Sequence, residues 1–127
     1  MQQDQQTTQD KGHHGENLAI AWLQQNGYVI LARNWRAGHH ELDIVASHQS
    51  ILCFVEVKTR TYQYYGAPED FLTPAQQKRI WQAACAYMRK NNYDGEVRFD
   101  IVSVYSPGGQ LPVIRHLKDV FFPGWNS

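Results

Sequence analysis

The stretch that decides the fold runs from residue 41 to residue 58 and reads ELDIVASHQSILCFVEVK. Its first part, Glu41 to Ala46, and its last part, Ile51 to Lys58, are rich in apolar and β-branched residues, and the polar group Ser47 to Ser50 separates them. Two such runs around a short polar turn predict a β-hairpin. The run Ile51 to Val55 is apolar at every position, as expected for a central strand that is covered on both faces.

This hairpin carries charged residues that an interior sheet surface normally avoids. Alternation along a strand places Glu56 and Lys58 on one face of the second strand, and Glu41 and Asp43 on one face of the first. Burying an unpaired carboxylate is costly, and neighbouring carboxylates raise one another's pKa. The arrangement therefore needs a counter-charge. Lys58 supplies one, and Mg²⁺ or Mn²⁺ held by Asp43 and Glu56 would supply more, because these cations prefer oxygen ligands.

A divalent cation at this position would suit the hydrolysis of a phosphodiester. It could polarise the phosphate and activate a water, while Lys58 orients that water or neutralises charge on the phosphorus oxygens. The same residues also fit a structural ion-pair network, or a site that keeps the fold without turnover. The triplet Glu56-Val57-Lys58 means little alone, but it ends an apolar strand and follows an acidic residue by one hairpin, which favours a metal-dependent nuclease.

The segments around the hairpin predict a mixed α/β domain. Ala19, Ile20 and Leu23 recur at helical spacing, and Gly27 is a natural end signal for that helix. Thr73-Pro74-Ala75-Gln76 has the pattern of a capping box and predicts the start of a second helix. The expected elements are a helix at 16–26, strands at 28–32, 41–46 and 51–58, a helix that starts at 73 and ends within 91–95, a strand at 97–101 and a short edge strand at 113–117, which is the order α-β-β-β-α-β(-β).

Length and composition predict one domain. The chain has 127 residues, 43% of them hydrophobic, which is enough for one packed core. Residues 1–11 are polar and are expected to form a disordered tail, which leaves 12–127 as the single domain. No apolar run is long enough for a membrane span, no signal peptide is present, and Cys53 and Cys85 lie in apolar settings, so a cytoplasmic protein is expected. The formal net charge is zero, so a phosphate-binding surface must be local.

Short motifs along most of the chain resemble one family. They are Gly15-Glu16 with Ala19, Gly27-Tyr28, Arg33-Asn34-Trp35-Arg36, Glu41-Leu42-Asp43-Ile44-Val45, the run from Phe54 to Arg60, and Arg98-Phe99-Asp100. Together they resemble the YraN family of bacterial proteins, which is similar to archaeal Holliday-junction resolvases and belongs among the restriction-endonuclease-like folds, a mixed β-sheet flanked by helices. One departure is His40, which stands where the family usually has a glycine and affects the local turn rather than the acidic residues beyond it.

The resemblance implies roles for the acidic residues and a function. It implies metal ligation by Asp43 and Glu56, a catalytic Lys58, and a helical Glu16 that completes the acidic cluster, while Glu41 has a weaker claim as a ligand. A favourable place at a helix N-terminus would explain Glu16 equally well. The implied activity is Mg²⁺- or Mn²⁺-dependent cleavage of DNA, on branched or flap structures, in DNA repair or recombination. Resolvase-like enzymes often act as symmetric dimers, so the resemblance is compatible with a homodimer.

The alternative function is that of a non-catalytic module that binds nucleic acid or a partner and retains the nuclease fold. A small-molecule enzyme has no support, because the chain has no Gly-rich phosphate loop of P-loop or dinucleotide type and no G-x-S-x-G motif. A zinc site built on His39 and His40 is discounted. Adjacent histidines on a strand point to opposite faces, and no Cys or spaced His completes a tetrahedral set.

Several cationic and aromatic residues are candidates for contacts with nucleic acid. Guanidinium groups hold phosphates and aromatic rings stack on splayed bases, although an ordinary solvated surface explains the same residues about as well. The candidates are Arg33, Arg36 and Arg60, the tyrosines at 62, 64 and 65, and Gln76, Lys78 and Arg79 at the start of the second helix. Arg98 and Asp100 lie on one strand face and are expected to form a structural pair.

Overall fold

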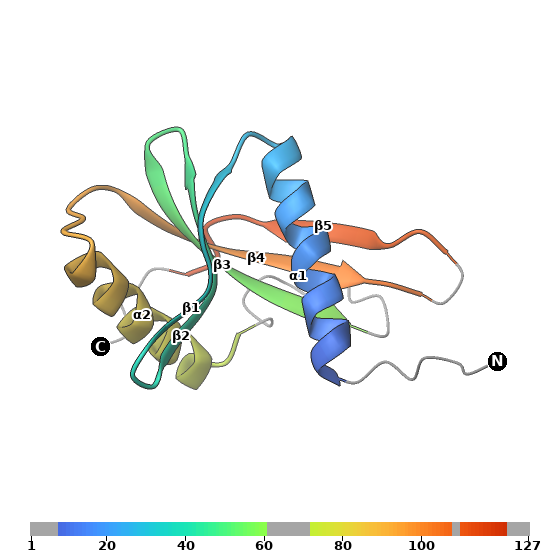
Figure 1. Cartoon of the computed structure of the whole chain (residues 1–127), viewed down its shortest axis with the longest axis horizontal. Helices are drawn as coiled ribbons and strands as arrows, with labels where there is room; N and C mark the ends of the chain where they lie inside the picture. The colour runs from blue at the N-terminus through green and yellow to red at the C-terminus, as the bar shows by residue number, and fades with distance from the viewer. Residues whose placement is uncertain (1–7, 61–71, 108–109, 122–127) are drawn as a thin grey trace.

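A five-stranded sheet in the order β1-β2-β3-β4-β5 forms the centre of the protein. The computed structural model describes residues 8–60, 72–107 and 110–121. Its elements are helix α1 (Thr8–Gln25), strands β1 (Val29–Ala37), β2 (His40–His48) and β3 (Ile51–Arg60), helix α2 (Pro74–Lys90), and strands β4 (Val97–Tyr105) and β5 (Val113–Leu117) (Figure 1). Strands β3 and β4 pair in parallel and the other neighbours pair antiparallel. The expected α/β class and element order are confirmed.

Strand β3 is covered on both faces, as its apolar run predicts. Cys53 and Val55 belong to the core cluster beneath α1, whereas Leu52 and Phe54 belong to the cluster beneath α2. Figure 1 shows α1 crossing one side of the sheet, while α2 lies beside β1 and β2. The parallel pairing of β3 with β4 requires a crossover connection, and α2 lies within it. The sheet is therefore the middle layer between two helices.

Three element boundaries differ from the sequence-based expectation by four residues or more, and several others differ by one or two. Helix α1 begins at Thr8 rather than at residue 16, so residues 8–11 are helical instead of belonging to a polar tail. Once a packed turn exists, each further helical hydrogen bond is cheap to add, so polar residues can continue the helix. Strand β1 continues to Ala37 and strand β4 to Tyr105, because each has a neighbouring strand to pair with along its length. Residues 1–7 lie outside the described part of the chain.

The predicted helix cap agrees with the structure, while the predicted turn at 47–50 is shorter, because Ser47 and His48 belong to β2. Gln49 and Ser50 both have positive φ, at 50° and 67°, as the tight turn between β2 and β3 requires. Thr73 and Gln76 form the expected capping box: Thr73 Oγ1 accepts from Gln76 N at 3.1 Å, and Gln76 Oε1 accepts from Thr73 N at 2.9 Å. Both cysteines are free. Among the described residues, no helix is long and apolar enough to cross a membrane.

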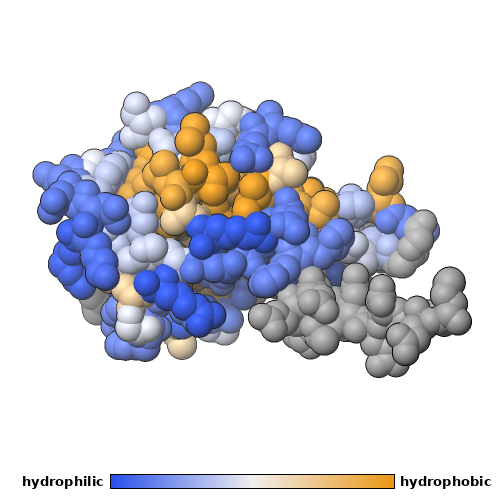
Figure 2. All heavy atoms as spheres, viewed as in Figure 1, coloured by the Kyte–Doolittle hydropathy of each residue, from blue (hydrophilic) through white to orange (hydrophobic). Residues whose placement is uncertain are grey.

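The surface combines a hydrophilic majority with a local apolar area. Figure 2 shows apolar side chains gathered on the viewed face near the upper end of α1, with hydrophilic side chains around them. Val29 and Leu31, at the start of the edge strand β1, are 62% and 50% exposed. The expected packing of the aromatic C-terminal tail holds for Phe121, whose ring lies 4.6 Å from that of Phe99. Phe122 and Trp125 lie outside the described residues.

Candidate active site

Asp43 and Glu56 lie side by side where strands β2 and β3 stop pairing. The registered pairing ends at Ile44 and Val55, and the two acids are the next residues on each strand. Asp43 Oδ2 accepts a hydrogen bond from the backbone N–H of Val57 at 2.8 Å. The end of the hairpin thus supplies two neighbouring carboxyl groups, and one of them is fixed in place by the backbone of the strand that carries the other.

The environment of this acid pair keeps a proton on it. Burial, the charge of Asp43 and a hydrogen bond between the two carboxyl groups together raise the pKa of Glu56 to about 8. The positive charges of Arg79 and Lys58 act in the opposite direction and do not outweigh them. Glu56 therefore keeps its proton at neutral pH, and a bound cation would supply positive charge that favours its ionised form.

Helix α1 brings a third acid to the same region. Glu16 Oε1 lies 3.9 Å from Arg33 Nε, and this oxygen is buried and has no hydrogen-bond partner. Burial and the charge of Asp43 raise the pKa of Glu16, while Arg33, His13 and a hydrogen bond from the Asn34 side chain lower it. The expected neighbourhood of Glu16 and Asp43 therefore exists, and the helix carries a carboxylate with one open acceptor oxygen.

Glu41 does not join these acids. It stands directly across from Arg36 in the pairing of β1 with β2, and Arg36 Nη2 lies 3.2 Å from Glu41 Oε1. Both side chains are largely exposed, at 72% for Arg36 and 54% for Glu41. Such an exposed cross-strand pair contributes little to stability. The position of Glu41 therefore favours a solvated acid over the metal ligand that the resemblance weakly implies.

The other candidate contacts for nucleic acid are spread over three elements. Arg33 is exposed on β1 beside Glu16, Arg60 is half-buried at the end of β3, and Lys78 is exposed on α2. Arg79, the next residue of α2, acts on Glu56 through its charge, so this side chain belongs nearer to the acid pair than the sequence indicated. The tyrosines at 62, 64 and 65 lie outside the described residues.

The donor set fits a magnesium-type cation better than zinc. Among the described residues, no group of three or more His, Cys, Asp or Glu side chains could hold a metal ion. Mg²⁺ commonly uses one or two carboxylates and completes its shell with water and substrate phosphate, so Asp43 and Glu56 suffice for it. The rings of His39 and His40 lie 4.4 Å apart. The two side chains do not point to opposite faces as predicted, because His39 lies in the turn before β2 rather than in the strand.

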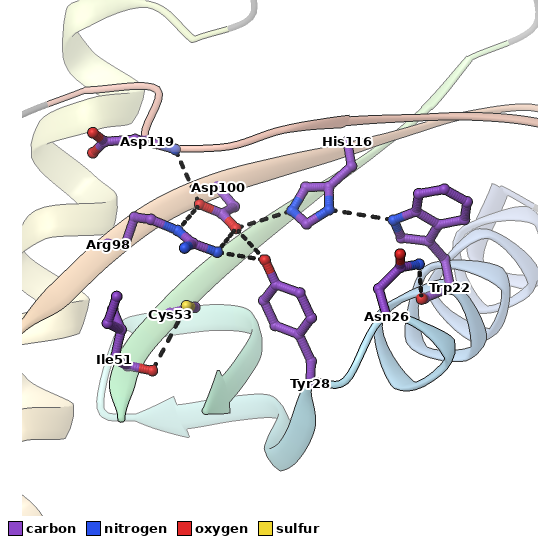
Figure 3. Close-up of polar contacts among 9 residues, drawn as sticks. All are labelled: Trp22, Asn26, Tyr28, Ile51, Cys53, Arg98, Asp100, His116 and Asp119. Atoms are coloured by element: carbon purple, nitrogen blue, oxygen red, sulfur yellow. Dashed lines mark hydrogen bonds and ion pairs between the residues drawn. The ribbon is translucent and has the colours of Figure 1, made fainter. Parts of the chain in front are cut away.

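A second polar cluster surrounds Asp100 (Figure 3). Arg98 donates from Nε and Nη2 to the two carboxylate oxygens, each at 2.9 Å, so the expected structural pair is confirmed. Tyr28 Oη and the backbone N–H of Asp119 donate at 3.4 and 3.1 Å, and His116 Nε2 lies at 2.9 Å. Burial raises the pKa of Asp100, but the hydrogen bonds from His116, Arg98 and Asp119 outweigh burial and lower it.

Most of this cluster could not be predicted from the sequence. Trp22 Nε1 donates to His116 Nδ1 at 3.2 Å, so Nε2 of the same ring carries the proton that faces Asp100. The Tyr28 ring stacks on His48 with 4.1 Å between centroids, and burial followed by the charge of Asp100 raises the pKa of Tyr28 to about 12. Arg98-x-Asp100 was the only sequence signal. The polar atoms around the Asp100 carboxylate are hydrogen-bonded to one another, whereas His48 Nδ1 is buried without a hydrogen-bond partner. The hydrogen-bonded part of this cluster is therefore a structural anchor.

Comparison with known proteins identifies the family. The sequence pattern of the uncharacterised protein family UPF0102 matches residues 15–104. This chain belongs to the UPF0102 family. A UPF0102 protein of Bacteroides thetaiotaomicron is 46% identical over 112 residues, which cover 88% of this chain and 92% of that protein. A UPF0102 protein of Cytophaga hutchinsonii is 44% identical over 110 residues, covering 87% and 94%. The resemblance to the YraN family is thereby confirmed at the level of the family, and the UPF0102 match spans Glu16, Asp43, Glu56 and Lys58.

Proposed function

We propose that this UPF0102 protein is a metal-dependent endonuclease that hydrolyses DNA phosphodiester bonds, with branched or flap structures as its substrates. The observation that carries the proposal is the Asp43–Glu56 pair, in which burial and the charge of Asp43 raise the pKa of Glu56 to about 8. The proposal includes a cytoplasmic location and, for cutting both strands of a branched substrate, a symmetric pair of subunits.

Each residue of the site has a distinct role in the proposed reaction. Asp43 and Glu56 would hold Mg²⁺ or Mn²⁺, which when bound polarises the phosphodiester and lowers the pKa of a water. The Lys58 ammonium, on the same strand as Glu56, neutralises charge that develops on the phosphorus oxygens. Glu16 offers its open oxygen Oε1 as an acceptor for a proton or hydrogen bond from the attacking water.

Arginine side chains would guide the DNA backbone to the acid pair. Arg33 and Arg36 are exposed on β1, and Arg79 extends positive charge from α2 toward Glu56. Guanidinium groups bind phosphate in two-pronged fashion and supply affinity without reading sequence. The protein as a whole has a formal net charge of zero, so this local set would have to supply the attraction.

A second candidate function is a non-catalytic module that binds nucleic acid. One observation favours it: Asp43 Oδ2 accepts a hydrogen bond from the backbone N–H of Val57, so one oxygen of this carboxylate already has a structural partner. In such a module the acid pair is only a structural contact, which would be more stable with its proton than without it. The two functions predict different consequences for cleavage and for metal binding.

The decisive experiment combines a cleavage screen with calorimetric titration of Mg²⁺ and Mn²⁺. The substrates are linear duplex, single-stranded, flap and four-way DNA, and the variants are Asp43→Asn, Glu56→Gln and Lys58→Ala. We expect the first two to lose metal binding and cleavage. Lys58→Ala should retain metal affinity and lose about 100-fold or more in turnover, because its charge acts mainly in the transition state. Glu41→Gln is the matched control and should cleave like the parent protein.

A parent protein that binds DNA and cuts none of these substrates with either metal would favour the binding module instead. A Lys58→Ala variant that cuts as fast as a cutting parent would overturn the catalytic role of Lys58, since removal of the cation nearest the acid pair along β3 would then have no effect on the chemistry.

A further inference from the structure

Helix α1 lies so close to the Thr59 side chain of strand β3 at Gly15 that a larger residue there would require a shift. A Cβ atom at Gly15 would lie 2.1 Å from Thr59 Oγ1 and 3.3 Å from Thr59 Cβ. The first distance is far below ordinary van der Waals contact, so a side chain at this position would require the Thr59 side chain or the helix to move. Glu16 is the next residue of the helix, so the close contact at Gly15 fixes the position of the Glu16 backbone relative to strand β3.

Strand β1 holds the same carboxylate from the other side. Asn34 lies within this strand with φ of 50°, in the left-handed region that residues other than glycine rarely adopt. Its side chain donates a hydrogen bond to the Glu16 carboxylate, and the neighbouring Arg33 pairs with Glu16 at 3.9 Å. An unfavourable backbone conformation inside a strand persists only when the surroundings impose it, and it is typical of residues that serve a site.

The contact at Gly15 and the hydrogen bond from Asn34 together hold the Glu16 carboxylate in place with one oxygen unpaired. Glu16 Oε1 is buried without a hydrogen bond, a state that costs free energy unless a ligand or water supplies the missing proton. We propose that Gly15 and Asn34 are positioning residues that hold the Glu16 carboxylate beside Asp43, with Oε1 directed to the water that attacks a bound substrate. This inference rests on the proposed nuclease function and assigns two residues to its machinery.

Asn34→Gly is the sharpest test, because it separates positioning from folding. Glycine adopts a φ of 50° without strain, so the variant should be as stable as the parent or slightly more stable. It lacks the side chain that holds Glu16, so we expect kcat on the cleaved DNA substrate to fall about 10- to 100-fold, with KM nearly unchanged. Asn92→Gly is the matched control: Asn92 has φ of 49° after helix α2, and the same substitution there should leave kcat unchanged.

A second pair of variants tests the contact between α1 and β3. Gly15→Ala should lower kcat, and Gly15→Ala combined with Thr59→Ala should recover much of it, because the second substitution removes the Oγ1 atom that lies 2.1 Å from the added Cβ. Thermal unfolding of each variant checks that it is folded. Thr59→Ala alone should cleave like the parent.

The outcomes distinguish this inference from the function on which it rests. If the parent protein cleaves no substrate, both the proposed function and the positioning roles fail. If the parent cleaves DNA and a folded Asn34→Gly keeps its full kcat, the role of Asn34 fails while the nuclease function stands. If Gly15→Ala keeps its full kcat, or if Thr59→Ala does not rescue it, the role of Gly15 fails in the same way.

Discussion

At the scale of single residues, Glu56 couples the stability of the protein to pH. Its ordinary pKa is 4.5 and the folded protein raises it to about 8, so between these values the folded state holds a proton that the unfolded chain has released. The contribution of this group to stability is fully present below the ordinary pKa and is lost as pH rises through the folded value. The pKa of Glu16 is also raised in the folded protein, so this residue changes stability with pH in the same direction.

We therefore expect the metal-free protein to lose stability between about pH 5 and pH 8, by on the order of 1 to a few kcal/mol. Glu56→Gln should remove much of this slope, because an amide keeps a hydrogen-bond donor toward Asp43 and does not titrate. Urea denaturation at several pH values measures the effect, with the exposed-acid variant Glu41→Gln as the control that keeps the parental slope. Parallel curves for the parent and Glu56→Gln would show that Glu56 does not carry the proton.

At the scale of elements, the cluster around Asp100 joins segments that are far apart in the chain. Asp100 lies on β4, His116 on β5, Trp22 on α1, and Tyr28 just before β1. The hydrogen bonds from Arg98, Tyr28, His116 and Asp119 converge on one carboxylate that is 1% exposed, and Trp22 joins them through His116. Loss of this group would leave the Arg98 guanidinium, with a side chain only 16% exposed, without the partner that stabilises its charge.

Asp100→Ala should therefore be strongly destabilising, by about 3 to 5 kcal/mol, because breaking one side of a buried ion pair leaves the other charge uncompensated. Arg36→Ala, which breaks the exposed pair with Glu41, should change stability by no more than about 0.5 kcal/mol. Chemical denaturation followed by circular dichroism compares the two variants. A loss for Asp100→Ala as small as that for Arg36→Ala would mean that the cluster does not anchor β4 to β5 and α1.

At the scale of the whole molecule, zero formal net charge limits how the protein can attract DNA. Affinity must come from a few local contacts that release counterions, so DNA binding should be modest and steeply salt-dependent. The exposed cross-strand pair of Arg36 and Glu41 allows a test of this salt dependence. One substitution removes a positive charge from β1 and the other removes a negative charge from β2. Both side chains lie outside the acid pair, so either change leaves the proposed chemistry intact.

Arg36→Ala should weaken DNA binding and lower the slope of log K against log salt by about one contact. Glu41→Gln should strengthen binding, because it removes a negative charge beside a phosphate-binding arginine. Fluorescence anisotropy with labelled flap DNA at several salt concentrations measures both. Binding that does not change with salt would contradict a phosphate-tracking surface, and weaker binding by Glu41→Gln would return Glu41 to the list of functional acids.

The sequence by itself determined what depends on neighbours along the chain. Strand alternation, the two-residue turn at Gln49 and Ser50, and the capping box at Thr73 are local, so the α/β order and the adjacency of Asp43 and Glu56 across one hairpin could be predicted. The Arg98–Asp100 pair followed from the same period of two along a strand.

Only the tertiary structure decided how distant elements meet. The contact of Gly15 with Thr59 and the hydrogen bond from Trp22 to His116 depend on how α1 docks on the sheet, and no periodicity encodes this. Glu41 shows the same limit within a hairpin: alternation predicted its face together with Asp43, but pairing with Arg36 across the strands turned it into an exposed ion pair. Side-chain direction follows local geometry, whereas the partner of a side chain follows from packing, where charge and volume from the whole chain compete for the same space.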